Sequence, residues 1–297
     1  MIGIKHALRF PKVSLLTNAL VTRLETDPAG RSIRRVVVEK DGTRQHYSAD
    51  IVVLCAGAIN SAALLLRSAD IKHPQGLANS SGTVGGITWP TTTRGSLLCI
   101  TSRLNPTSFQ KTMGLNDYYL GAADSERPLG HISLLIKMDG TTMKTGAGLL
   151  VPTCLLNSMA RHSFDFWLTS EDLPDPNNRV RVSPSGQVQL SYTPNNLEAH
   201  VRLVRKLKEL TSELLPFGLK LDKRIPLAGT AHQCGTLRFG DDPKTSVLDR
   251  NCRAHDLDNL YVADSSFFVS SSAVNPALTI MANALRVANE VRRQLVA

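Results

Sequence analysis

The chain has 297 residues, of which 42% are hydrophobic and 20% are charged, and its formal net charge is +9. This composition is typical of a soluble globular protein with a sizeable buried core, in one large domain or two medium ones. The lysines and arginines are scattered without a basic run. The positive charge therefore indicates a generally basic surface, and no nucleic acid or other polyanion partner is expected.

The five cysteines indicate neither a disulfide scaffold nor a zinc site, because their number is odd and no CxxC motif occurs. No metal is expected, and Cys55, which lies in an apolar stretch, is expected in the core. No apolar run approaches about 18 residues, so no transmembrane helix is expected. The first residues lack the features of a signal peptide. No compartment is indicated, although the cytoplasm is slightly favoured.

The first part of the chain predicts short strands followed by a helix. Residues 13–18 form a short strand candidate. The β-branched run 33–39, a turn and residues 44–47 indicate a β-hairpin or meander. Residues 50–55 (DIVVLC) are continuously apolar, which is typical of a strand buried on both faces. Residues 60–68 predict a helix.

The middle of the chain has a different pattern. Residues 73–94 are rich in Gly, Pro, Ser and Thr and mark a boundary or a long loop. From residue 96 to about residue 192, alternating segments predict a second, mostly antiparallel sheet. Its clearest strand candidates are residues 131–137, 163–169, 179–183 and 187–192, the last two joined by the turn Pro184-Ser185-Gly186.

The last third predicts two helices and one strand. An amphipathic helix runs from Asn195 or Asn196 to about Leu215. Residues 260–263 (LYVA) predict a second buried strand. The final helix covers residues 278–295 and is opened by Pro276.

The two buried strands lie far apart in the sequence and flank the sheet-rich middle. This arrangement predicts one domain built from both ends of the chain with another domain inserted into it. We place the first domain at residues 1–75 and 225–297, and the inserted domain at residues 76–224.

The chain has no GxGxxG motif, with which a nucleotide-binding α/β domain normally begins. Gly146-Ala147-Gly148 follows a polar stretch and lacks the third glycine. The strand at 50–55 does run into Ala56-Gly57-Ala58 and a helix, and a helix amino terminus favours phosphate. Such a turn is common, however. If the protein binds a dinucleotide, the principal phosphate loop is absent from this chain.

Residues 229–280 carry the most specific motifs. Their order and spacing resemble the carboxy-terminal part of the glucose-methanol-choline (GMC) oxidoreductases, which are FAD-dependent alcohol and sugar oxidoreductases. Residues 50–66 resemble a second signature of that family, and residues 167–172 (WLTSED) look like its sugar and polyol dehydrogenase branch. The main motifs are His232-Gln233-Cys234-Gly235-Thr236, Arg238-Phe239-Gly240, Asn259-Leu260-Tyr261-Val262-Ala263-Asp264 and Asn275-Pro276-Ala277-Leu278-Thr279-Ile280.

The resemblance implies a mixed α/β fold, with a partial Rossmann-like FAD-binding domain and an inserted, mostly antiparallel substrate-binding domain. It also implies an enzyme that oxidises a CH–OH group of an alcohol, sugar or polyol, with FAD as cofactor and an electron acceptor of unknown kind. His232 matches the catalytic His, and a neutral imidazole can take the hydroxyl proton. Asn275 matches the partner of that base; before a proline it is also a good helix N-cap.

The same resemblance implies a set of FAD-binding residues. Asp264 ends a strand, where its carboxylate can bind ribityl or ribose hydroxyls. Ala56 and Gly57 let the backbone approach the ADP part, and Val21 matches the position whose backbone meets adenine. The helix that begins at Pro276, next to Asn275, would direct its positive end at the pyrimidine ring of the flavin.

Two alternatives remain at this point. The amino-terminal third of the family fold is missing, so the chain could be a catalytically inactive truncated fragment that cannot hold FAD. A polyanion-binding protein is a further hypothesis, which rests on net charge alone. In the inserted sheet, Trp167 and Phe166 either face the substrate or belong to the core, and aromatic residues on strands are more often core.

Overall fold

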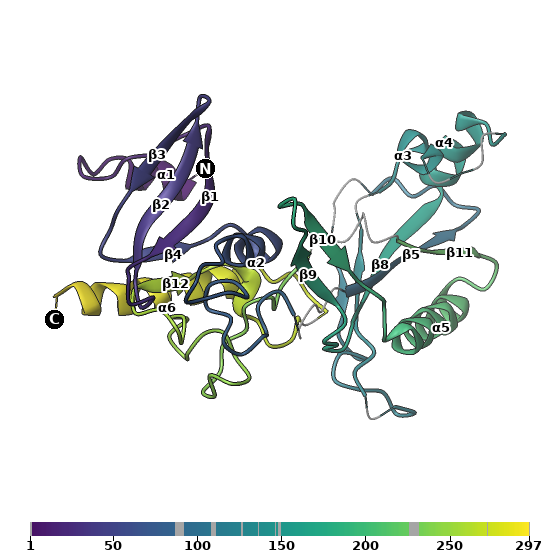
Figure 1. Cartoon of the computed structure of the whole chain (residues 1–297). Helices are drawn as coiled ribbons and strands as arrows, with labels where there is room; N and C mark the ends of the chain where they lie inside the picture. Colours follow the sequence, from purple (N-terminus) through teal and green to yellow (C-terminus); the bar gives the residue numbers. More distant parts are fainter. Residues whose placement is uncertain are drawn as a thin grey trace.

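The computed structural model describes residues 2–86, 92–107, 111–125, 127–135, 137–145, 147, 150–225, 232–271 and 273–296. Figure 1 shows two lobes, one formed by the two ends of the chain and the other by its middle. The hairpin of β9 (Arg179–Val182) and β10 (Val188–Ser191) lies between them. The Gly146-Ala147-Gly148 stretch, which was not expected to form a phosphate loop, falls largely outside the described residues.

The first lobe contains an antiparallel sheet of β1 (Ala19–Thr26), β2 (Ile33–Lys40) and β3 (Thr43–Tyr47), and a short helix α1 (Ile2–Ala7) precedes it. The strand expected at residues 13–18 is wrong. The chain is irregular there, and β2 pairs with residues 19–26 instead. The reason is burial, since Leu24 of β1 is 2% exposed whereas Leu15 is 54% exposed.

A two-stranded parallel sheet of β4 (Val52–Leu54) and β12 (Leu260–Val262) joins the two ends of the chain. Helix α2 (Ala58–Arg67) follows β4, and helix α6 (Ala277–Val296) ends the lobe. The expectation that residues 50–55 are buried on both faces is only partly met, because Val53 is 43% exposed. Cys55 was expected in the core and is exposed instead. A sheet of only two strands leaves these side chains uncovered.

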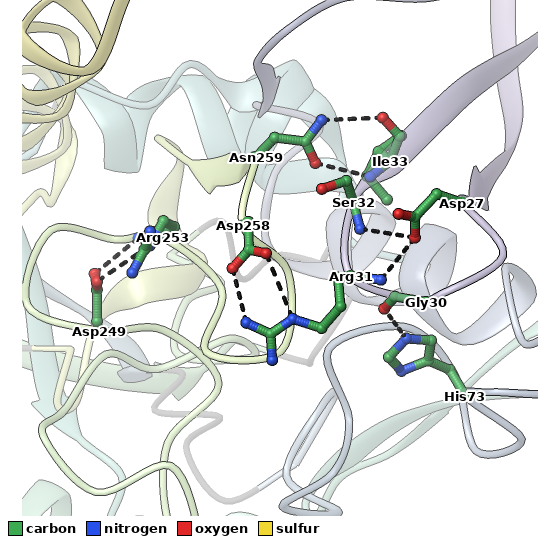
Figure 2. A network of polar contacts seen from close by, with 10 residues as sticks. All are labelled: Asp27, Gly30, Arg31, Ser32, Ile33, His73, Asp249, Arg253, Asp258 and Asn259. Atoms are coloured by element: carbon green, nitrogen blue, oxygen red, sulfur yellow. Dashed lines mark hydrogen bonds and ion pairs between the residues drawn. The ribbon is translucent and has the colours of Figure 1, made fainter. Parts of the chain in front are cut away.

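Polar contacts attach the antiparallel sheet to the carboxy-terminal segment, as Figure 2 shows. The Asn259 side chain accepts a hydrogen bond from Ile33 N (2.7 Å) and donates one to Ile33 O (3.0 Å). Arg31 forms an ion pair with Asp258 at 3.0 Å. His73 lies 2.8 Å from Gly30 O. The loop before β2 is thereby fixed against the segment that leads into β12.

The second lobe is built on a five-stranded sheet in the order β11-β5-β8-β7-β6, and every neighbouring pair is antiparallel. Helix α5 (Leu197–Leu214) packs on β5 and β8 and buries Leu203 and Leu207. Two shorter helices are α3 (Gly140–Lys144) and α4 (Thr153–Arg161). The strands are β5 (Thr92–Ile100), β6 (Gly114–Leu115), β7 (His131–Leu134), β8 (Ser163–Glu171) and β11 (Leu219–Arg224).

The two lobes have separate hydrophobic cores. One core joins residues from the two ends of the chain, including Leu24, Leu65 and Leu260. The other lies between the five-stranded sheet and α5. Leu77 and Val180 belong to the first core although they fall within residues 76–224. The fold is therefore mixed α/β, and the division at residues 75 and 225 stays a prediction. Among the described residues, no helix is long and apolar enough to cross a bilayer.

Candidate functional site

A cavity of about 400 Å³ is lined by residues of both lobes and contains the residues expected to be catalytic. Its volume is in the range of small-molecule sites. One wall is formed by strands of the five-stranded sheet, and the other by His232 and the segment before α6. Its principal lining residues are Met113, His131, Ser133, Trp167, Thr169, His232 and Asn275.

The strand wall follows from the alternation of side chains in a sheet. Trp167 and Thr169 are two positions apart on β8, so they lie on the same face. On β7, Ser133 pairs with Trp167 and His131 pairs with Thr169. Thr169 also donates a hydrogen bond to Ala273 O, which ties this face to the segment that carries Asn275. Trp167 thus faces the cavity, whereas Phe166 is 6% exposed in the core.

Hydrogen bonds to two neighbouring elements hold the loop after His232 in place. Gly235 N donates to Ser265 O (3.0 Å), and Leu237 N donates to Ser266 O (2.9 Å). The Thr236 hydroxyl donates to Ala58 O at the start of α2 (2.6 Å). These contacts fix the loop between α2 and the short 3-10 helix Ser265–Phe267, so that half-buried His232 lines the cavity.

Asn275 lies at the amino end of α6. The first helical hydrogen bond runs from Ile280 N to Pro276 O (3.0 Å), so Pro276 occupies the capping position. The expected start of this helix at Pro276 is thereby confirmed within one residue. Asn275 is exposed toward the cavity that His232 also lines. The two residues are 43 positions apart in the sequence, and only the fold brings them to one site.

The cavity contains a second histidine, His131, to which sequence analysis assigned no function. Its Nδ1 lies 2.7 Å from Asn116 Oδ1. Because a carbonyl oxygen only accepts, Nδ1 carries a proton and Nε2 can accept one. Burial lowers the pKa of His131, while a backbone hydrogen bond at Leu115 opposes this effect. The sequence places His131 on a predicted strand, two positions before Ser133. This pattern does not show which strand lies beside it, so His131 could not be assigned to the site from the sequence.

A second group of expected residues meets at the carboxyl ends of β4 and β12. The Asp264 carboxylate is 7% exposed, and its Oδ2 accepts hydrogen bonds from Gly57 N (2.9 Å) and the Ser61 hydroxyl. Its Oδ1 accepts from Ser266 N (2.8 Å). Ala56 N donates to the Ser61 hydroxyl at 3.1 Å. Three protein donors therefore use most of the acceptor capacity of Asp264.

Gly57 precedes the first turn of α2 in a conformation that favours glycine, with φ = 80° and ψ = 160°. A Cβ at Gly57 would meet no atom within 4 Å. The turn therefore presents backbone at a helix amino terminus to open space. Val21 belongs to neither group, since it lies on β1 and pairs with Val38 of β2.

Comparison with known proteins finds a matching family profile. Residues 174–284 match the sequence profile of a family described as GMC oxidoreductase. Over this segment the chain is similar to the GMC oxidoreductases. It matches the carboxy-terminal portion of that family, and the matched segment contains His232, Asp264 and Asn275, whereas Val21 and Gly57 precede it.

Two relatives among the GMC oxidoreductases cover almost the whole chain. Paromamine 6'-oxidase from Streptomyces fradiae is 29% identical over 96% of this chain and 53% of its own length. The large subunit of fructose dehydrogenase from Gluconobacter japonicus is 26% identical over 99% of this chain and 57% of its own length. The chain thus spans about half the length of the curated relatives that it matches.

The fold is also that of solved GMC structures. A formate oxidase from Aspergillus oryzae, studied for modification of its FAD, superposes with a TM-score of 0.64. The match covers 96% of this chain and 61% of the oxidase at 15% identity. A likeness at this identity concerns the fold alone.

Proposed function

We propose that the chain contributes the substrate side of an FAD-dependent site that oxidises a CH–OH group of an alcohol, sugar or polyol. The observation that carries this proposal is the meeting of His232 and Asn275 in one cavity whose strand wall contains Trp167 and Thr169. The names of the relatives support the substrate class, since one is an oxidase of paromamine and another a dehydrogenase of fructose.

In this proposal His232 takes the proton of the substrate hydroxyl. A neutral imidazole is suited to that role near neutral pH. The Asn275 amide donates a hydrogen bond to the same oxygen and so orients it. His131, on the opposite wall, offers an acceptor for a further substrate hydroxyl. The Trp167 ring lies in the strand wall, where its apolar surface can pack against a sugar ring.

The residues present fit FAD at two places. The open space in front of Gly57 and the amino terminus of α2 suit a phosphate or ribose group. The amino end of α6 beside Asn275 suits a group that gains negative charge. The chemistry that FAD supplies when bound is acceptance of the hydride from carbon. Asp264, Ala56 and Val21 stay proposed contacts, with Asp264 largely engaged by protein donors.

A second candidate is an inactive chain that cannot hold FAD alone. One observation favours it: Leu278, Met281 and Leu285 form a stripe on α6 and are 76%, 58% and 70% exposed. The parallel β4–β12 sheet has only two strands, whereas parallel sheets are usually covered on both faces. Apolar surface of this kind is usually covered in a complete domain.

Purification with added FAD distinguishes the two candidates. Retained flavin absorbance that a sugar or polyol bleaches under anaerobic conditions supports the enzyme. His232→Ala is expected to retain flavin and to slow bleaching at least about 100-fold, because general base catalysis contributes 10²–10⁴. Replacing the exposed His46 by Ala is the matched control. A colourless protein that does not respond to FAD would refute activity for this chain.

A further inference from the structure

We propose that Asp165 and Lys137 form a distal subsite that binds hydroxyl groups on the second ring of a glycoside substrate. The inference rests on the proposed function, because it extends the substrate cavity of His232 and Asn275. It narrows the substrate from any alcohol or sugar to a disaccharide-like molecule that is oxidised at one end and held at the other.

The five-stranded sheet connects the cavity of His232 with the proposed subsite at Asp165. Asp165, Trp167 and Thr169 occupy alternate positions of β8, so their side chains lie in a row on one face. The four residue steps from Thr169 to Asp165 span about 13 Å at about 3.3–3.4 Å per residue. Leu135 directly follows the neighbouring strand β7, continues its row of side chains and donates its N–H to Asp165 O (2.7 Å).

A second, smaller cavity of about 150 Å³ lies at the Asp165 end of this row. It is lined by Asp165, Lys137 and Asn105 among others. Thr112 and Leu135 line both this cavity and the larger one that contains His232. The two cavities are therefore neighbours along the same sheet face, and a ligand long enough to pass Trp167 can reach both.

The Asp165 carboxylate has one oxygen whose hydrogen-bonding capacity the described residues leave unused. The residue is 4% exposed, and its Oδ2 accepts a hydrogen bond from Met138 N (2.9 Å). Its Oδ1 is buried and has no hydrogen-bond partner among the described residues. Buried polar atoms are nearly always partnered, and an unmet one costs stability. A hydroxyl donor in the small cavity would satisfy Oδ1.

Lys137 limits which chemical group of a ligand can donate a hydrogen bond to Asp165 Oδ1. Its Nζ donates to the carbonyl oxygens of Asn105 and Arg161, which uses two of its three N–H groups. An ammonium group on the ligand would meet the Lys137 cation, and a carboxylate would meet the Asp165 anion. A neutral hydroxyl pair meets neither difficulty, because one hydroxyl can donate to Asp165 while its neighbour accepts from Lys137. Neutral sugar hydroxyls therefore fit both groups.

The length of the row sets the size of the ligand. The Thr169 and Asp165 positions are about 13 Å apart along β8, which is longer than a single sugar ring, whereas two linked rings span the distance. We therefore expect disaccharides to bind more tightly than their component monosaccharides, and the difference to depend on Asp165 and Lys137.

Equilibrium binding to the purified chain tests the subsite without flavin or turnover. Cellobiose, maltose and lactose are compared with D-glucose and D-galactose by titration calorimetry or ligand-observed NMR. Asp165→Asn and Lys137→Met are each expected to weaken the tightest disaccharide about tenfold and to leave monosaccharide binding unchanged. Asp50→Asn, an exposed carboxylate of the other lobe, is the control. Circular dichroism verifies that each variant is folded.

Three outcomes overturn the subsite: no disaccharide binds more tightly than a monosaccharide, both variants bind disaccharides like the wild type, or either variant weakens glucose equally. If Asp165→Asn does not fold, Lys137→Met alone decides. These results are separate from the proposed function. A chain that fails to hold FAD can still show disaccharide binding that depends on Asp165, and a flavin-loaded chain can lack it.

Discussion

His200 makes the stability of the second lobe dependent on pH. It lies on α5, is 5% exposed, and its Nδ1 is 3.4 Å from the Ser170 hydroxyl. Burial is the main cause that lowers its pKa to about 4; the Arg224 cation acts in the same direction, and Asp222 partly opposes them. The folded protein therefore holds His200 neutral where an unfolded chain, with a histidine pKa of about 6.5, binds a proton.

The sign follows from proton linkage. Between pH 6.5 and about 4 the unfolded chain binds more protons at this position, so the free energy of unfolding falls as the pH falls. Each pH unit between the two values contributes about 1.4 kcal/mol. The full loss is about 3 kcal/mol by pH 4, and it is absent above pH 7. This is a large fraction of the stability of an ordinary domain.

Urea unfolding at pH 4, 5, 6 and 7, followed by circular dichroism, measures the effect. His200→Gln keeps a polar side chain that does not titrate, so its free energy of unfolding is expected to fall less than that of the wild type, by about 3 kcal/mol between pH 7 and pH 4. His46→Gln, at an exposed position on β3, is the control and is expected to follow the wild type. Equal pH dependence in the wild type and His200→Gln would refute the reasoning.

Two substitutions test the backbone geometry around the site by urea unfolding and by the cavity's ligand binding. Asp264→Asn places an amide where Oδ2 accepts from Gly57 N and Ser61, and the loss of these charge-assisted bonds is expected to cost about 2–3 kcal/mol; an unchanged midpoint would contradict this role. Gly130→Ala puts a Cβ 2.0 Å from Thr169 O at φ = 139°, so we expect a loss of at least about 2 kcal/mol and weaker sugar binding; a fully stable variant would show that β8 can shift.

Local patterns predicted many elements because their causes are local. The hairpin of β2 and β3 turns at Asp41 and Gly42, both of which have positive φ. Helix α5 lies where the apolar spacing of Val201, Val204 and Leu207 predicts it, but its buried face is turned toward Leu203 and Leu207, and Val201 is 57% exposed. Predictions failed where a neighbour decides the outcome. Residues 13–18 include Val13, Leu15 and Leu16, yet β2 pairs with β1. Cys55 is exposed because the described β4–β12 sheet has only two strands.

The sequence by itself determined the family resemblance and, with it, the candidate roles of His232 and Asn275. Their motifs occur in continuous stretches whose spacing can be read without a fold. Only the tertiary structure decided that Trp167 faces them, that His131 joins them, and that Asp165 lies farther along the same row. Alternation along β8 indicates which residues share a face, but the pairing of β7 with β8 and the contact of Thr169 with Ala273 decide what that face meets.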